Sequence, residues 1–429
     1  MKEIIILGAG TAGTMMSHHI KKKIKEEVNV TIIDAYEKHY YQPGFLFIPF
    51  DTYTPKQVIK NKKDLIHKSA NFILSELDVI KPEENIVKLK DGKELKYDIL
   101  IVATGCKIVP DELDGLLDEA GWRKNIFDFY TIEGSIALRD FFRTWEGGKL
   151  VLNIAEMPIK CPVAPLEFLF LADDFLTKKG IRDKCELVLV TPLSGAFTKQ
   201  NCSNVLGYML EEKNIKLEAE YNISEVNAKE NKIISYDDRE VDYDLLITIP
   251  PNMGDDLIER SNMGDELNFI PTDKNTLQSK AHKNIFVIGD ATDLPASKAG
   301  SVAHFEAEIL IENLELFLQG KELKKDFDGH ANCFIESGFG KAFLIDFNYD
   351  LEPVQGKFPL ASVGPFKLLK ETRINHWGKL AFRHIYWSLL LKAKKMPFVT
   401  AKMQLKGKEI PKELEEKYKD LINGGQNDS

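Results

Sequence analysis

The chain has 429 residues, of which 44% are hydrophobic, and its 57 Lys and Arg against 66 Asp and Glu give a formal net charge of −9. Its length predicts two or three domains with apolar cores of their own, and its acidic balance argues against a nucleic-acid partner. No apolar run approaches the roughly 18 residues of a membrane-spanning helix, and no leader motif precedes the first strand, so we expect a cytoplasmic protein.

The first 35 residues predict a strand, a glycine turn, a helix and a second strand. Gly8, Gly10 and Gly13 form a G-x-G-x-x-G pattern. Ala12 lies inside the pattern, and Asp34 follows 21 residues after Gly13. In such a turn the glycines permit a tight bend, close approach of the backbone to a pyrophosphate and close packing of the helix on the strand, while the acid binds a ribose hydroxyl. The segment is therefore predicted to bind a dinucleotide.

Two later segments end an apolar strand in small or polar residues. Residues 72–105 contain short alternating strands separated by turn signals. Residues 285–308 repeat the logic of the N-terminus, with a strand, a glycine and then a helix whose N-terminal amides can face an anionic group. The second of these strand ends is predicted to line the dinucleotide site through Gly289 and Asp290, and the first ends in Ala103, Thr104 and Gly105.

Residues 149–250 are predicted to form a second nucleotide-type domain. The runs KLVLNIA and CELVLVTP predict parallel buried strands around a helix at about residues 164–179, and the closing strand at residues 243–251 repeats the strand that precedes Ala103. The turn after the first of these strands contains three prolines and no glycine. Because proline lacks the N–H that binds phosphate, we predict that this domain has no NADH site.

Cys161 lies in this proline-rich turn, where the start of the next helix favours a thiolate. We predict that Cys161 is redox-active, with a buried structural thiol as the alternative. None of the five cysteines has metal-like CxxC spacing, so neither a metal site nor attached haem is predicted. For Cys106, Cys185 and Cys202 we favour a structural role, and the polar neighbours of Cys202 are typical of a surface thiol.

The motifs KCPVAP around Cys161 and NCFIESGFG around Cys333 resemble those of the sulfide:quinone oxidoreductase family and of its flavocytochrome c sulfide dehydrogenase relatives. The resemblance extends from residue 8 to about residue 397. It implies an α/β fold with two Rossmann-like domains in tandem and a C-terminal region that caps a bound FAD. It also implies that a Cys161–Cys333 pair oxidises sulfide, with Cys333 in contact with the flavin, and that a quinone is reduced.

Under this resemblance the catalytic residues are Cys161, Cys333, Glu167 and Lys298. Lys298 is expected beside the flavin and the quinone, with an exposed lysine as the alternative. Glu167 is a candidate proton acceptor or, equally, a solvated acid of the first helical turn. Cys333 has a small buried hydrophobe as its alternative. The residues expected to bind FAD are Gly8, Gly10, Ala12, Gly13, Asp34, Ala103, Thr104, Gly105, Gly289, Asp290 and Lys298.

Residues 358–398 combine aromatic and basic side chains, a mixture that suits segments lying in a membrane interface. A core or a dimer interface is the alternative. Phe339, Phe343 and Phe358 are candidate quinone contacts, with ordinary packing as their alternative. The side chains of the mixture are Phe358, Phe366, Trp377, Phe382, Tyr386, Trp387 and Phe398 with Lys367, Lys370, Arg373, Lys379, Arg383, Lys392, Lys394 and Lys395.

We therefore expect an FAD-binding domain at residues 1–110 and 271–330, a second Rossmann-like domain at 111–270, and a capping, quinone and membrane-contact region at 331–429. The leading hypothesis is a homo-oligomeric flavoprotein enzyme, peripheral on the cytoplasmic side of the cell membrane, that passes electrons from sulfide to quinone. The alternatives are a type II NADH:quinone oxidoreductase, a sulfide dehydrogenase that reduces a cytochrome, and a redox-sensing protein whose flavin turns over slowly.

Overall fold

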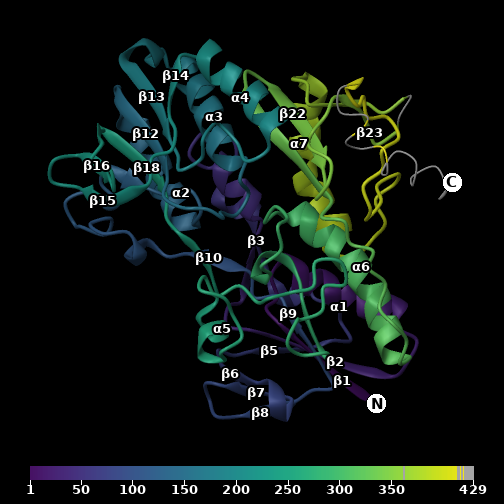
Figure 1. Ribbon diagram of the computed structural model, residues 1–429. Coiled ribbons are helices and arrows are strands. Elements are labelled where there is room, and N and C mark those ends of the chain that lie inside the picture. The colour runs from purple at the N-terminus through teal and green to yellow at the C-terminus, as the bar shows by residue number, and fades with distance from the viewer. Residues whose placement is uncertain (361–362, 413–415, 417–418, 420–429) are drawn as a thin grey trace.

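A parallel sheet at the bottom of Figure 1 carries both glycine turns. The structure is a computed structural model that describes residues 1–360, 363–412, 416 and 419. In spatial order this first sheet contains β20 (Ile285–Val287), β9 (Ile99–Val102), β1 (Lys2–Leu7), β2 (Val28–Asp34) and β5 (Asn71–Leu74). Its central strands are buried runs of Ile, Leu and Val, as expected for a parallel sheet covered on both faces. Helices α1 (Thr11–Lys23) and α6 (Gly300–Leu318) pack against each other beside it.

A second parallel sheet lies at the upper left of Figure 1. Its order is β11 (Ile126–Phe127), β18 (Leu245–Ile249), β12 (Gly148–Ile154), β13 (Cys185–Val190) and β14 (Ile215–Glu218). The helices of this part are α2 (Ile132–Thr144), α3 (Ala164–Lys179) and α4 (Gln200–Glu212). Helix α3 ends at Gly180, whose φ of +75° suits a glycine C-cap. The predicted strands and the predicted helix at 164–179 are confirmed.

The C-terminal region forms a sheet of its own with one amphipathic helix. The order is β21 (Ala331–Gly338), β22 (Lys341–Phe347), β24 (Phe366–Leu368) and β23 (Gly356–Phe358). Helix α7 (Arg373–Ile385) packs on β21 and β22 and continues into the π-helical turn η8 (Tyr386–Leu390). Helix α3 of the second sheet packs on β21, so this region is in contact with the second domain.

Shorter elements connect the main sheets. They are β3 (Lys38–Tyr40) with β4 (Ile59–Asn61), β6 (Leu77–Lys81) with β7 (Ile86–Leu89) and β8 (Glu94–Lys96), β10 (Cys106–Ile108) with β19 (Asn252–Gly254), β15 (Ile223–Asn227) with β16 (Lys232–Ser235) and β17 (Glu240–Asp242), and helix α5 (Asp256–Arg260). The β10–β19 pair joins the segment after β9 to the segment after β18. Within the described ranges, no helix is both long and apolar enough to cross a bilayer.

Three side chains of the aromatic and basic mixture are buried instead of facing outward. Lys379 and Trp387 are each 8% exposed and Tyr386 is 2% exposed. The Tyr386 hydroxyl lies 2.6 Å from His39 Nε2 and 2.7 Å from Thr11 Oγ1, which places η8 against the first domain. For these three residues the core alternative is correct: Tyr386 and Lys379 have hydrogen-bond partners inside the protein, and the Trp387 ring packs against His39 and Tyr386. Trp377 and Phe398 remain exposed, at 67% and 66%.

Candidate functional site

Three strand ends meet at one edge of the first sheet. Strands β1, β9 and β20 run parallel side by side, and Gly8, Ala103 and Gly289 follow their carboxyl ends. A Cβ at Gly8, whose φ is +91°, would lie 2.4 Å from the Ala103 carbonyl oxygen. A Cβ at Gly289 would lie 3.3 Å from the Ala12 Cβ. The predicted FAD residues of three distant segments are therefore in contact, at the edge where parallel α/β sheets bind ligands.

The edge has features that an FAD would complement. A Cβ at Gly10, Gly105 or Gly300 would meet no atom of the described residues within 4 Å, so backbone is open there for close approach. The hydroxyl of Thr104 is buried and has no hydrogen-bond partner in the described part of the chain. Buried hydroxyls are ordinarily paired, so this one suits a polar ligand atom. The residues present fit the expected FAD.

Asp34 ends β2 and holds the glycine turn. Its Oδ2 accepts the N–H of Ala9 at 2.7 Å, and its Oδ1 accepts the N–H of Tyr36 at 2.9 Å and forms an ion pair with Lys62 Nζ at 2.5 Å. A carboxylate has about four acceptor positions. Asp34 therefore keeps capacity for a ribose hydroxyl, as predicted for this position.

Lys298 is buried, which rules out the exposed alternative. Its Nζ donates to the carbonyls of Asp290 at 3.0 Å and Thr292 at 2.8 Å and lies 3.6 Å from the centre of the Phe269 ring. Burial raises the pKa of the Asp290 carboxyl and Lys298 opposes that rise. Helix α6 begins at Gly300, after the loop at residues 291–299, so the helix does not follow the glycine turn directly.

A buried acid supports the second glycine turn. Glu306 of α6 accepts the N–H of Gly289 at 2.6 Å, and burial raises the pKa of this carboxyl to about 7. In the unfolded chain the same group ionises near 4.5. Since the folded pKa is the higher one, the stabilisation present at low pH is lost as the pH rises from about 4.5 through about 7.

We predict that Glu306→Gln removes this loss. The amide keeps the acceptor for Gly289 but cannot ionise, so at about pH 8 the variant should unfold with a free energy higher than wild type by up to about 3 kcal/mol. Urea unfolding at about pH 5 and pH 8 measures the difference. Glu312→Gln, at an exposed position of the same helix, is the control. Its free energy of unfolding should differ from that of wild type by the same small amount at both pH values. An equal effect at both pH values would contradict the prediction.

Both predicted redox cysteines are held by one short segment before and at the start of α6. The N–H of Cys161 donates to the Lys298 carbonyl at 2.7 Å. The Ser301 hydroxyl hydrogen-bonds the Cys333 sulfur. The two thiols are also close enough for Cys333 to raise the pKa of Cys161. Segment 298–301 thus brings together two residues that are 172 positions apart, and it directly follows the loop from the Gly289–Asp290 turn.

The helix start favours a Cys161 thiolate, as the sequence predicts, but only weakly. Cys161 lies three residues before α3, and its carbonyl accepts the Ala164 N–H at 2.8 Å. The same N–H acts to lower the pKa of the Cys161 thiol, with a smaller effect than burial, Glu167 or Lys379. Burial raises the pKa of the Cys161 thiol, and Glu167 raises it further. Burial likewise raises the pKa of Cys333, to about 11, while Lys379 acts in the opposite direction. The cation that favours thiolates here is therefore a side chain.

That cation, Lys379 of α7, was not identified as a site residue from the sequence. Its Nζ donates to Glu167 Oε1 at 2.7 Å and to the Phe334 carbonyl at 3.1 Å. Glu167 is fully buried, so it is not a solvated helix acid, and its Oε2 has no partner among the described residues. In the sequence Lys379 resembles its basic neighbours. The available signal was its i,i+4 spacing from Asn375, a polar residue that is also buried.

We predict that Lys379→Met destabilises the protein by about 3–5 kcal/mol, because it leaves the Glu167 carboxylate buried without its cation. Chemical denaturation of the purified protein measures this. Lys178→Met is the control: its ion pair with Asp174, at 2.8 Å, leaves the lysine 70% exposed, so the loss should stay below about 1 kcal/mol. Equal losses in the two variants would show that the buried ion pair contributes no more to stability than the exposed one.

The three candidate quinone residues do not form one ring cluster. Phe339, between β21 and β22, is 45% exposed and lies near Lys213, whose Nζ is 4.6 Å from the ring centre. Phe343 is buried in β22, and Phe358 lies in β23. No ring contact recorded for the described residues joins any two of them.

The other cysteines differ in their surroundings. Cys202 is fully buried on α4 and close enough to Cys333 to interact with it electrostatically, so the expectation of a surface thiol is wrong. Cys185 is buried and its sulfur donates to the Ile181 carbonyl at 3.2 Å. The Cys106 sulfur lies 3.9 Å from Asp290 Oδ2, beside the predicted FAD residues.

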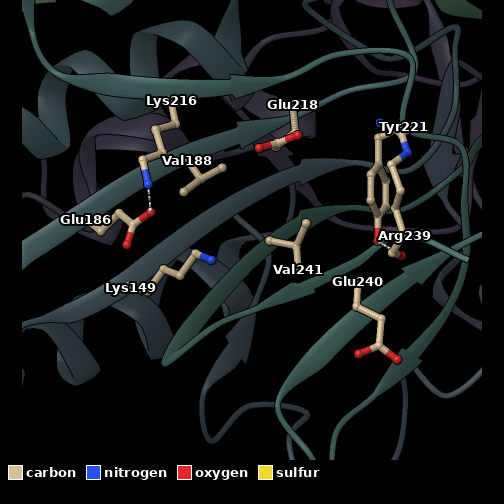
Figure 2. Close-up of a pocket in the computed structure, with 9 residues that line it drawn as sticks. All are labelled: Lys149, Glu186, Val188, Lys216, Glu218, Tyr221, Arg239, Glu240 and Val241. Atoms are coloured by element: carbon tan, nitrogen blue, oxygen red, sulfur yellow. Dashed lines mark hydrogen bonds and ion pairs between the residues drawn. The ribbon is translucent and has the colours of Figure 1, made fainter.

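A pocket of about 230 Å³ lies between the second sheet and the β15–β17 sheet (Figure 2). Charges of both signs line it, and Lys216 pairs with Glu186 at 2.7 Å. Its lining is Lys149, Glu186, Val188, Lys216, Glu218, Tyr221, Arg239, Glu240 and Val241. None of the predicted site residues belongs to this lining, so the pocket is separate from the cysteine and FAD site.

Comparisons with known proteins agree with this site. The pyridine nucleotide-disulphide oxidoreductase family model matches residues 2–132. The mitochondrial sulfide:quinone oxidoreductase of Dictyostelium discoideum is 30% identical over 91% of this chain and 86% of that protein, and the Mus musculus enzyme is 26% identical over 94% and 86%. The solved structure of the Aquifex aeolicus sulfide:quinone oxidoreductase shares the fold, with a TM-score of 0.76 and 18% identity over 92% of each chain. The chain belongs to the sulfide:quinone oxidoreductase family, whose members use FAD.

Proposed function

We propose that this protein is an FAD-dependent enzyme that oxidises sulfide at the Cys161–Cys333 pair and passes the electrons to a quinone. The observation that carries the assignment is that the Cys161 backbone and the Cys333 thiol both bond to segment 298–301, which follows the turn at Gly289 and Asp290. A pair of this kind suits sulfur chemistry beside a flavin. Family membership supports the same activity.

The chemistry is a thiol–disulfide exchange followed by electron transfer. Hydrosulfide attacks a Cys161–Cys333 disulfide or trisulfide, one new S–S bond forms, one old S–S bond breaks, and one cysteine leaves as a thiolate. Each hydrosulfide oxidised to sulfane sulfur releases one proton and two electrons. Bound FAD would supply the two-electron acceptor on the Cys333 side, so that the persulfide and the thiolate join again through the bound sulfur, and it would pass the electrons on to the quinone. A second hydrosulfide takes up the bound sulfur and releases polysulfide.

The surrounding residues have separate tasks in this reaction. Lys379 stabilises the anionic sulfur, since both thiols lie in its field. Glu167 accepts a proton at its unpaired Oε2, and burial raises the pKa of this carboxyl toward the range useful for a base. Tyr130 donates to the Lys160 carbonyl at 2.6 Å and so supports Cys161, whose φ of +48° is uncommon for a residue with a side chain.

On the quinone side we propose Lys298 as the cation beside the flavin, with Phe339, Phe343 and Phe358 as candidate contacts. Peripheral membrane binding through the C-terminal region, on the cytoplasmic side, completes this proposal. Its support is a set of exposed apolar side chains beside lysines and arginines, which suits a membrane interface. The exposed set is Leu360, Val363, Ile374, Trp377 and Phe398.

We also propose the domain division given by the sequence and a homo-oligomeric state. The first sheet draws its strands from residues 2–102 and 285–287, and the second sheet from residues 126–249. This supports an FAD domain at 1–110 and 271–330 with an inserted domain at 111–270. The region 331–429 lies partly outside the described residues.

The geometry argues against one of the three alternatives. An NADH:quinone oxidoreductase needs backbone amides after β12, where this chain has Pro158, Pro162 and Pro165. The reaction of an NADH:quinone oxidoreductase also does not require a buried cysteine pair with a shared lysine. An enzyme that reduces a cytochrome, or a sensor whose flavin turns over slowly, would have the same cysteine site. The rate of flavin reoxidation by each acceptor distinguishes these two alternatives from a quinone reductase.

The test mixes the FAD-loaded protein anaerobically with sulfide or with NADH, follows the visible flavin band, and then adds a short-chain quinone. We expect bleaching by sulfide and rapid recovery with quinone. Bleaching by NADH and not by sulfide would contradict the proposal and assign an NADH:quinone oxidoreductase activity. Bleaching by sulfide that recovers with a cytochrome but not with quinone would assign the cytochrome-reducing activity, and slow recovery with every acceptor would indicate a sensor.

A further inference from the structure

Four ionisable side chains form a cluster between α3, β21 and α7, within reach of both cysteines. The Glu336 N–H donates to Glu167 Oε1 at 2.9 Å, the oxygen that also accepts from Lys379. The Glu336 carboxylate accepts from Nδ1 of His376, at 2.8 and 3.0 Å. These hydrogen bonds join Lys379, Glu167 and the Glu336 backbone, and they join the Glu336 carboxylate to His376. Both cysteines lie within the electrostatic influence of Glu167 and Lys379.

Only one member of the cluster reaches solvent. The side chains of Glu167 and Glu336 are 1% exposed and that of Lys379 is 10% exposed, whereas that of His376 is 22% exposed. Two carboxylates and one lysine carry one excess negative charge, and a protonated His376 cancels it. The hydrogen bond that His376 donates to Glu336 raises the pKa of His376 above its ordinary value, so the charged form persists toward neutral pH.

The charge of this cluster matters because the sulfur chemistry creates anions beside it. Lys379 is the shared cation of Cys161 and Cys333, and Glu336 competes for the same cation whenever its own partner is neutral. On the basis of the proposed function, we infer that His376 is a positioning residue. In its protonated form it neutralises Glu336, so that Lys379, paired with Glu167 alone, stabilises the cysteine thiolates and the incoming hydrosulfide.

The other charged groups around His376 either pair with each other or affect its pKa less than Glu336 does. Asp174 and Lys178 of α3 act on it in opposite directions and pair with each other at 2.8 Å. On the β22 side, Lys341 pairs with Glu371 at 2.8 Å. Tyr53 of the first domain lies in the field of Glu336 and Lys379 and is a neutral phenol. Glu336 is therefore the group that His376 controls.

The first test reads the thiol itself, without turnover. Iodoacetamide alkylation of Cys161 is followed by mass spectrometry against pH in wild type, His376→Asn, and the double variant Glu336→Gln with His376→Asn. We expect His376→Asn to slow alkylation about tenfold near pH 7 and to match wild type near pH 9, where the wild-type histidine is neutral too. The double variant lacks the uncompensated carboxylate and should return to within about threefold of wild type.

His384→Asn is the matched control, because it replaces an exposed histidine of the same helix. It should alkylate as wild type at every pH. A His376→Asn variant that is slowed by one constant factor at all pH values, with no recovery in the double variant, would overturn the inference and leave His376 a purely structural role.

The second test separates this inference from the proposed function. The rate of flavin bleaching by sulfide is measured for the same variants. Each rate is divided by the wild-type rate at the same pH, so that the effect of sulfide ionisation cancels. The ratio for His376→Asn should approach one as the pH rises. If sulfide does not bleach the wild type, the proposed function fails while the alkylation result stands; if it bleaches the wild type and the ratio is independent of pH, the inference alone fails.

Discussion

Replacing Cys161 or Cys333 with serine is expected to slow the bleaching of the flavin by sulfide by at least about a thousandfold. A hydroxyl cannot form the sulfur–sulfur bonds through which the electrons pass, and either substitution removes the exchangeable disulfide entirely. The two single variants should therefore be equally inactive, and combining them should add little, since both act on one bond. Anaerobic stopped-flow absorbance with sulfide as the reductant measures the rate.

Cys185→Ser is the control for this pair. Cys185 is a buried thiol whose sulfur donates to the Ile181 carbonyl at 3.2 Å, a contact that a serine hydroxyl retains. Its rate should equal that of wild type. If Cys161→Ser or Cys333→Ser bleached at the normal rate, another thiol would have to carry the electrons, and Cys202, which interacts with Cys333, would be the next candidate.

Gly13→Ala is expected to abolish FAD binding and to destabilise the fold by more than about 3 kcal/mol. A Cβ at this position would lie 1.9 Å from the Gly8 carbonyl oxygen and 3.2 Å from Ile6 Cγ2. Both obstacles belong to β1 or to the turn that follows it, so the clash can be relieved only by moving α1 away from the sheet. The flavin content after purification and the thermal unfolding midpoint measure the two effects.

Two other glycines make this prediction specific. A Cβ at Gly207, within α4, has its nearest neighbour at 4.0 Å, so Gly207→Ala should stabilise the protein by about 0.5–1 kcal/mol. A Cβ at Gly10 meets no described atom within 4 Å, so Gly10→Ala should fold normally and lose FAD affinity. A Gly13→Ala variant with normal flavin content would mean that the turn relaxes without cost and that the predicted clash is absent in solution.

Features set by local chemistry were predictable from the sequence. The strand, turn and helix over residues 2–23 follow from an apolar run and a glycine spacing, and α3 begins and ends where the sequence predicts. Side-chain burial was less predictable. Cys202 has polar neighbours in the chain yet is fully buried, because sequence neighbours on a helix point to different faces.

The dinucleotide turn, the lack of a glycine turn after β12 and the two cysteine motifs could be predicted from the sequence, because each of these depends on residue type at short spacing. By contrast, the contacts of both cysteines with segment 298–301, and the pairing of Lys379 with Glu167, 212 positions earlier in the chain, depend on the packing of distant elements. Such pairs form when packed layers bring distant elements together. The burial that results, which no local pattern encodes, turns a surface-like lysine into the cation of the cysteine site.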